Sequence, residues 1–135
     1  MHKEYINPRG LFNSTQFGFS QAVVSDPGKL VFISGQVSSD EQLQVIGGAD
    51  MIAQARHAFE NLKSVMEQAG GHLKDIVSLR LYIVDYREED SSAISGILKE
   101  YFGESHAPAS TWIGVKSLAN NKFLIEVEAQ AVLPA

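Results

Sequence analysis

The residues best suited to chemistry lie in two short runs of alternating side chains near the C-terminus. Glu126 belongs to the run Leu-Ile-Glu-Val-Glu at 124–128, and Ser110 and Trp112 alternate with β-branched neighbours in the run at 109–115. Such alternation is typical of strands whose two faces meet different surroundings. From it we expect Glu126, Ser110 and Trp112 to share one face of a sheet. A carboxylate there can position water or exchange protons with a bound molecule.

Arg80 is a candidate cation for the same face, because it alternates with apolar residues in a third run, at 76–84. A guanidinium group can bind both oxygens of a substrate carboxylate. Structural interpretations stay open for both charged residues. Glu126 can be an ordinary polar residue of a hydrated sheet, and Arg80 can form a subunit salt bridge with Glu126 or Glu128.

Two amphipathic helices and several strands must position these side chains. Apolar residues recur at helical spacing over 51–69, where Asp50 can cap the start and Gly70 can end the helix, and again from about 92 to 102. Strands are predicted at 76–84, 109–115 and 123–132, with an N-terminal hairpin of 21–24 and 30–34 around a turn.

This order of elements predicts an α+β fold: one mostly antiparallel mixed sheet with two helices packed on one face. The 135 residues suffice for a single domain, 1–135, and are too few for two. The sheet face away from the helices carries a mixture of polar and apolar residues. We expect that face to meet another subunit.

Composition narrows the classes of partner. The net charge of −5, with 11 scattered basic residues, argues against nucleic acid, and no apolar run is long enough to span a membrane. The first residues lack the apolar core of a signal peptide and the chain has no cysteine, so a cytoplasmic location is expected. The four histidines form no metal-ligand pattern, and nothing predicts a metal or a cofactor.

The chain resembles the YjgF/RidA family, the reactive intermediate deaminases, over nearly its whole length. Single motifs are weak, but their order and spacing together are specific. The matching motifs are Gly18-Phe19-Ser20-Gln21-Ala22, Ile33-Ser34-Gly35-Gln36, Gln54-Ala55, Asn61-Leu62, Ala69-Gly70, Asp75-Ile76-Val77, the strand end at 82–85, Pro108-Ala109 and Ile125-Glu126-Val127-Glu128.

The resemblance implies a chorismate-mutase-like fold and a homotrimer whose three sheets form a central barrel, with small-molecule clefts between subunits. It implies an enamine/imine deaminase, a hydrolase that needs no cofactor and releases ammonia. Glu126 matches the glutamate that positions or activates water. Ser34 and Gly35 match a backbone segment lining the cleft.

Four departures bear on the reaction, one of them Ser95, onto which a cleft asparagine of the family maps less securely than the others. The arginine that holds the substrate carboxylate in deaminating members, in the motif Pro-Ala-Arg-Ser, is replaced by Ser110. Phe19 stands where a tyrosine is common, and Trp112 where a small residue or cysteine is common. The pattern resembles the family's divergent subgroups that lack the arginine, for which deaminase activity is not implied.

Three functions therefore stay open. The first is a small-imine deaminase with Glu126 as catalytic residue and with Ser110, Trp112, Phe19, Ser34, Gly35 and Arg80 as binding residues. The second is a non-catalytic trimeric binder of a small metabolite. The third, a ribonuclease, is the least consistent with the acidic composition.

Overall fold

The structure is a computed structural model that describes residues 1–135. Its short 3-10 helices are η1 (Ser14–Phe17), η2 (Leu73–Asp75) and η3 (Glu88–Asp90). Its other elements, in chain order, are β1 (Lys3–Ile6), β2 (Ala22–Ser25), β3 (Lys29–Val37), α1 (Met51–Gln68), β4 (Ile76–Val84), α2 (Ser91–Phe102), β5 (Ala109–Val115) and β6 (Ile125–Leu133).

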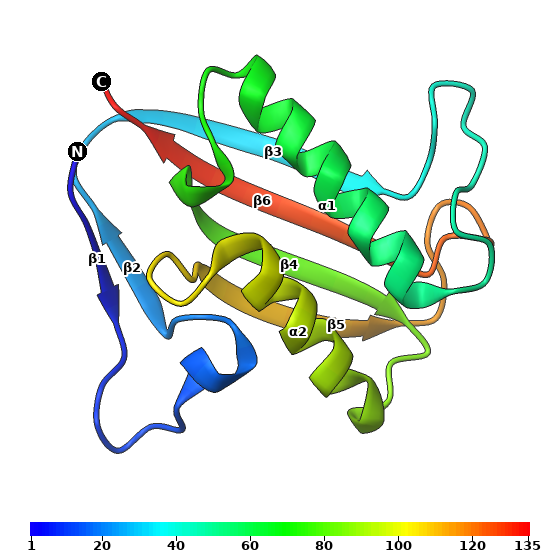
Figure 1. Cartoon of the computed structure of the whole chain (residues 1–135), viewed down its shortest axis with the longest axis horizontal. Coiled ribbons are helices and arrows are strands. Elements are labelled where there is room, and N and C mark those ends of the chain that lie inside the picture. Colours follow the sequence, from blue (N-terminus) through cyan, green and yellow to red (C-terminus); the bar gives the residue numbers. More distant parts are fainter.

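One four-stranded sheet with two helices on one face forms the body of the molecule (Figure 1), which confirms the predicted arrangement. The strand order is β3-β6-β4-β5, with β3 and β5 at the two edges. The β3–β6 and β6–β4 pairs are antiparallel, and β4–β5 is parallel. A parallel pair needs a long crossover connection, which α2 supplies here.

The helix α1 begins and ends where the sequence predicts. The Asp50 carboxylate accepts hydrogen bonds from the backbone N–H groups of Ile52 and Ala53, at 3.0 and 3.3 Å. Gly70, with φ of 90°, follows the last turn in the left-handed conformation that glycine adopts without strain. The face toward the sheet is buried and consists of Gln54, Ala55, Ala58, Phe59, Leu62 and Met66.

The predicted hairpin between 21–24 and 30–34 is wrong. β2 pairs antiparallel with β1 in a separate two-stranded sheet, whereas β3 pairs with β6. The turn at 26–28 therefore leads from one sheet to the other, and Asp26 accepts a hydrogen bond from the His2 backbone N–H at 2.9 Å. The true partner of β2 lies in the first six residues, whose sequence carries no clear alternation.

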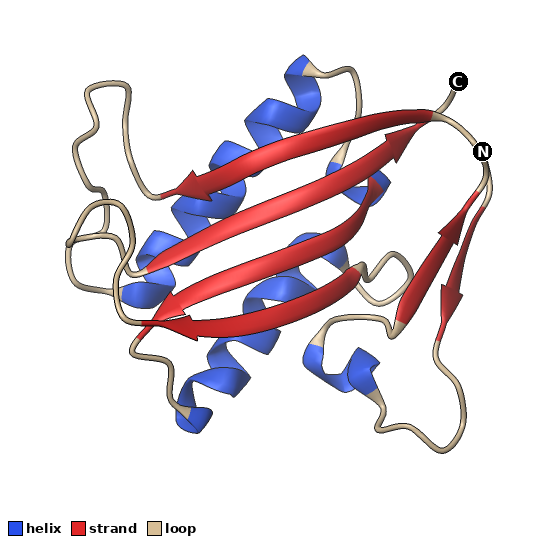
Figure 2. Cartoon of the chain, turned by 180° about the vertical axis from the view of Figure 1, so that it is seen from behind, coloured by secondary structure: helices blue, strands red, loops and turns tan.

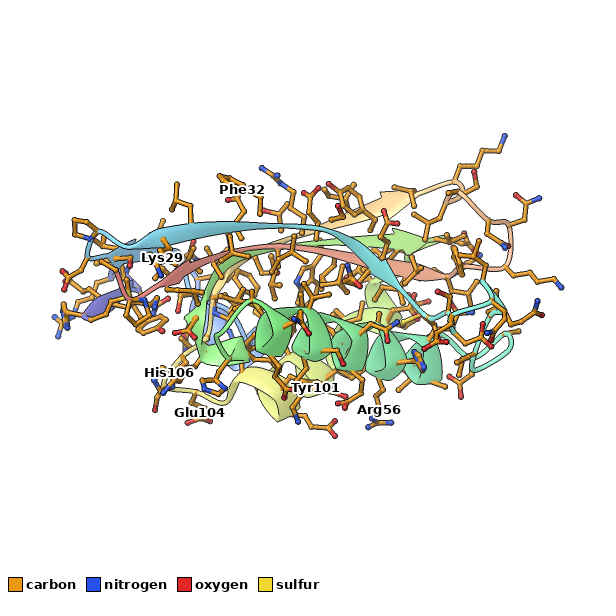
Figure 3. All side chains as sticks on the ribbon, turned by 90° about the horizontal axis from the view of Figure 1, so that it is seen from above. Lys29, Phe32, Arg56, Tyr101, Glu104 and His106 are labelled. Carbon is orange, nitrogen blue, oxygen red and sulfur yellow. The ribbon has the colours of Figure 1, made fainter.

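The second face of the main sheet is left uncovered by the chain's own helices (Figure 2). On β3, Leu30 and Phe32 are 67% and 72% exposed. Phe32 stands on the side of the sheet opposite the helices (Figure 3). We call this surface the open face. Large apolar side chains there make it a candidate contact surface.

Candidate functional site

Glu126, on β6, lies directly against the backbone of Gly35 on the neighbouring strand β3. A Cβ atom at residue 35 would be 2.5 Å from Glu126 Cδ and 2.8 Å from Oε2. Only glycine permits so close an approach of side chain to backbone. The Glu126 carboxylate, which is partly buried, is thereby held over the backbone of β3.

Gly35 is part of a β-bulge. Ile33 pairs with Ala129 and Gln36 with Val127, so β3 has one residue more than β6 over this interval. Ser34 and Gly35 therefore lie outside the regular pairing, and the Ser34 carbonyl accepts a hydrogen bond from Gln36 Nε2 at 3.0 Å. Bulges of this kind redirect side chains and expose backbone groups beside active sites.

Arg80 is paired within its own chain. Its Nη1 lies 3.2 Å from Glu128 Oε1, and the Tyr82 hydroxyl donates to the same oxygen at 3.4 Å. Burial, and then the Glu128 carboxylate, raise the pKa of Tyr82. Arg80 thus has a structural partner on the open face and does not contact Glu126 through a salt bridge.

The prediction that Ser110 and Trp112 share the face of Glu126 is wrong. In the parallel register, Ser110 lies beside Leu79 and Trp112 beside Leu81, both of which are buried under the helices. Glu126 instead lies beside Tyr82 on the open face. The alternation in β5 assigns its residues to two faces of the strand but does not show which face points toward the helices. An edge strand need not present a continuous apolar face to the core.

Phe19, Ser110 and Trp112 form a compact group on the helix side of β5. Trp112 Nε1 donates a hydrogen bond to Ser110 Oγ at 3.0 Å. The ring of Phe19 meets the indole edge-on, with centroids 5.8 Å apart. Phe12 continues the series, 6.2 Å from Phe19. We call Phe12, Phe19 and Trp112 the aromatic ladder.

The N-terminal arm brings Phe19 to this position. Gly18 adopts φ of 92° and packs on α2, where a Cβ would be 2.8 Å from Leu98 Cβ. The Ser20 backbone N–H donates to the Pro108 carbonyl at 2.9 Å, which ties the arm to the start of β5. Ser95, on the same helix beside Gly18, is buried and its hydroxyl has no hydrogen-bond partner.

The seven predicted site residues therefore fall into separate groups. Ser34, Gly35 and Glu126 lie together beside β3, and Ser34 also lines a pocket on the open face with Arg80 and its partner Glu128. Phe19, Ser110 and Trp112 lie together at the edge formed by β5. β4 stands between β6, which carries Glu126, and β5, and the two groups lie on opposite faces of the sheet, so one chain does not bring them together.

Sequence reasoning missed Phe12 as a neighbour of the site. Its only signal was the density of phenylalanine in the arm, at 12, 17 and 19. Three or more His, Cys, Asp or Glu side chains are nowhere arranged to hold a metal ion. None of the helices is both long and apolar enough to cross a bilayer.

Comparison with known proteins shows which family the chain belongs to. The family model described as Endoribonuclease L-PSP matches residues 13–133. A 2-iminobutanoate/2-iminopropanoate deaminase from Dermatophagoides farinae is 31% identical over 115 residues, covering 85% of each chain. A 3-aminoacrylate deaminase, RutC, from Acinetobacter baylyi is 34% identical over 102 residues, covering 76% of this chain and 78% of RutC.

Among solved structures, YyfB from Yersinia pestis, a Rid-family protein of unknown function, superposes with a TM-score of 0.94 at 36% identity. The match covers 98% of this chain and all of YyfB. The fold, the family model and the relatives agree, and the chain belongs to the Endoribonuclease L-PSP family, which is the YjgF/RidA family.

Proposed function

We propose that the protein hydrolyses a small imine or enamine, with release of ammonia, at clefts between the subunits of a homotrimer. The observation that carries the proposal is the contact of Glu126 with Gly35, which holds a carboxylate over an irregular, exposed stretch of backbone. The deaminase names of two relatives support the same class of reaction.

The positions of the two groups support a cleft between subunits. Glu126 is near the β3 edge, whereas Ser110 and Trp112 are on the β5 edge. In the proposed trimer the β5 edge of one copy packs beside the open face of the next copy next to β3, so Ser110 and Trp112 of one chain lie across the boundary from Glu126 of the other. Contacts of this kind close into rings when the rotation between copies is right. The exposed Leu30 and Phe32 supply apolar surface for that contact.

In this site Glu126 acts on water. The water oxygen bonds to the imine carbon as the water gives one proton to the Glu126 carboxylate, and Glu126 then passes that proton to the imine nitrogen. Glu126, again a carboxylate, takes the hydroxyl proton of the resulting carbinolamine and gives it to the amine nitrogen, the C–N bond breaks, and ammonia leaves as the carbonyl forms. Bonds and charges balance: imine and water give carbonyl and ammonia.

The decisive experiment compares Glu126→Gln with the natural protein. The imine is generated in situ by an amine oxidase, and ammonia and carbonyl product are both measured. Gln keeps the size of the side chain but cannot take up the proton, so we expect the rate to fall about a hundredfold, within the range typical of a general base. Glu128→Gln, two residues along the same strand, is the matched control and should keep most of the activity.

Sedimentation tests the assembly separately. The proposal requires a particle of about three times the 14.8 kDa chain mass, for both variants and for the natural protein. If the protein is a monomer and still deaminates, the inter-subunit cleft is refuted but the reaction is not. If it is a trimer and Glu126→Gln is as fast as the natural protein, Glu126 is not a catalytic residue.

A further inference from the structure

The aromatic ladder is a continuous apolar wall that reaches the protein surface. Phe12 meets Phe19 at an interplanar angle of 69°, and Phe19 meets Trp112 at 61°, both in edge-on contact. Trp112 packs against the core, whereas Phe12 is 60% exposed. Its neighbour Leu11 is 56% exposed. The wall therefore runs from inside the fold to an outer end that the chain leaves uncovered.

The polar group at the inner end of the ladder is Ser110. Its Oγ accepts the Trp112 indole N–H, which is the only hydrogen-bond donor of the ladder's side chains. The Ser110 hydroxyl hydrogen is not used in that bond, so Ser110 can donate one hydrogen bond to a ligand. Neither Ser110 nor any residue of the ladder is charged. A carboxylate pressed against such a wall would lose its hydration without a charged partner, which is unfavourable.

We propose that the ligand of this site carries a planar apolar group that packs along the aromatic ladder and has no carboxylate next to Ser110. A phenyl-type group matches the edge-on geometry of the ladder, and a carbonyl or imine beside it can accept the Ser110 hydroxyl hydrogen. The chemistry performed on that ligand rests on the proposed function, but its binding does not.

The test uses four stable carbonyl compounds that vary the ring and the carboxylate independently. Acetophenone has the ring alone, phenylglyoxylate has both groups, acetone has neither, and pyruvate has the carboxylate alone. Trp112 is the only tryptophan, so its indole N–H gives one assignable peak in a ¹H–¹⁵N spectrum of the full chain. Titration of that peak measures affinity at the ladder directly.

We expect acetophenone to bind at least about tenfold more tightly than acetone, because a buried ring removes far more apolar surface from water than a methyl group does. We also expect it to bind about tenfold more tightly than phenylglyoxylate. Equal affinities for acetophenone and acetone, or for acetophenone and phenylglyoxylate, overturn the inference. Tighter binding of phenylglyoxylate than of acetophenone overturns it as well, as does an indole peak that does not move at millimolar acetophenone.

Phe12→Leu and Phe19→Leu show whether the ladder is responsible. Each keeps an apolar side chain but loses a ring, and each should reduce the preference for acetophenone over acetone. Phe17→Leu is the matched control, because Phe17 contacts Phe12 and is not part of the ladder. Phe12 is mostly exposed, so its variant tests the inference even where Phe19→Leu does not fold.

Turnover separates this inference from the proposed function. An aromatic preference in binding, with no ammonia released from the corresponding imines, supports the ladder and refutes the deaminase. Release of ammonia at similar efficiency from aromatic and methyl imines refutes the ladder and leaves the deaminase standing.

Discussion

The Glu126 carboxylate and the Gly35 backbone are so close that no side chain fits between them. A methyl group at residue 35 would lie 2.5 Å from Glu126 Cδ and 2.7 Å from Cγ. Glu126 is therefore positioned by the absence of a neighbouring side chain rather than by a hydrogen bond of its own. The bulge in β3 and the glycine within it act together on this one carboxylate.

Gly35→Ala is expected to impair catalysis without unfolding the protein. The added methyl group pushes Glu126 away, and misplacement of a catalytic group by about 1 Å can cost roughly a hundredfold in rate. In a Glu126→Ala background the same change should have little further effect, because the group it displaces is already gone. Steady-state kinetics of the four proteins measure this coupling.

Gly96→Ala is the control for that series. Gly96 lies in α2, and nothing stands within 4 Å of an added Cβ. Alanine in a helix interior is more stable than glycine by about 0.5–1 kcal/mol, so the control should unfold at slightly higher temperature with unchanged kinetics. Additive effects of Gly35→Ala and Glu126→Ala would contradict the positioning role.

Ser110→Arg is expected to improve turnover of substrates that carry a carboxylate, such as 2-aminoacrylate. A charge-assisted hydrogen bond contributes about 1.5–3 kcal/mol, so a guanidinium clamp can raise the rate roughly tenfold to a hundredfold. The measurement compares both proteins on one imino acid. Robust activity of the natural protein on that acid would instead mean that another cation already anchors the carboxylate.

If Ser110→Arg brings no improvement, the indole is the next obstacle. The substitution also removes the hydroxyl that accepts the Trp112 N–H. Trp112→Cys combined with Ser110→Arg removes the bulk as well, and the double variant should then gain activity that neither single change provides.

Gln54→Leu is expected to destabilise the fold strongly. The Gln54 side chain is fully buried and links two loops: it donates to the Gly48 and Lys122 carbonyls and accepts from the Leu124 N–H, at 2.7, 2.9 and 2.8 Å. Each backbone group left unpaired costs about 1–3 kcal/mol, so for three such groups a loss of at least about 3 kcal/mol is expected.

Urea unfolding at one fixed protein concentration measures this loss, since assembly would otherwise add to it. Gln68→Leu, an exposed position on the same helix, should change stability by less than about 0.5 kcal/mol. Similar midpoints for the two variants would show that the loops do not depend on Gln54.

Stability should fall in the alkaline range partly because of Tyr101. Burial, and then the nearby Glu60 carboxylate, raise the pKa of Tyr101 to about 12 from 10.0. The folded state thus favours the neutral phenol, so the contribution is complete below pH of about 10 and is lost as the pH rises toward about 12. Tyr101→Phe should flatten part of the fall in melting temperature between those values. If Tyr101→Phe and the natural protein lose melting temperature equally over this pH range, Tyr101 makes no such contribution.

The sequence predicted the main elements because their apolar spacing is regular. The helix from Met51, the strand from Ile76 and the strand Ala109–Val115 match their predicted bounds closely. It did not predict the partner of β2, because pairing depends on distant residues and not on the turn. Nor did it predict the direction of Ser110 and Trp112, which the parallel register with β4 decides.

The separation of the two groups on opposite faces of one sheet has a genetic consequence. In the proposed assembly every cleft takes Glu126 from one chain and Trp112 from the next. Two inactive alleles, one altered at each position, should then complement one another when expressed together. If the two kinds of chain mix at random, about a quarter of the clefts would combine an unaltered Glu126 from one chain with an unaltered Trp112 from the next. A cell carrying both alleles would then regain activity that neither allele confers alone.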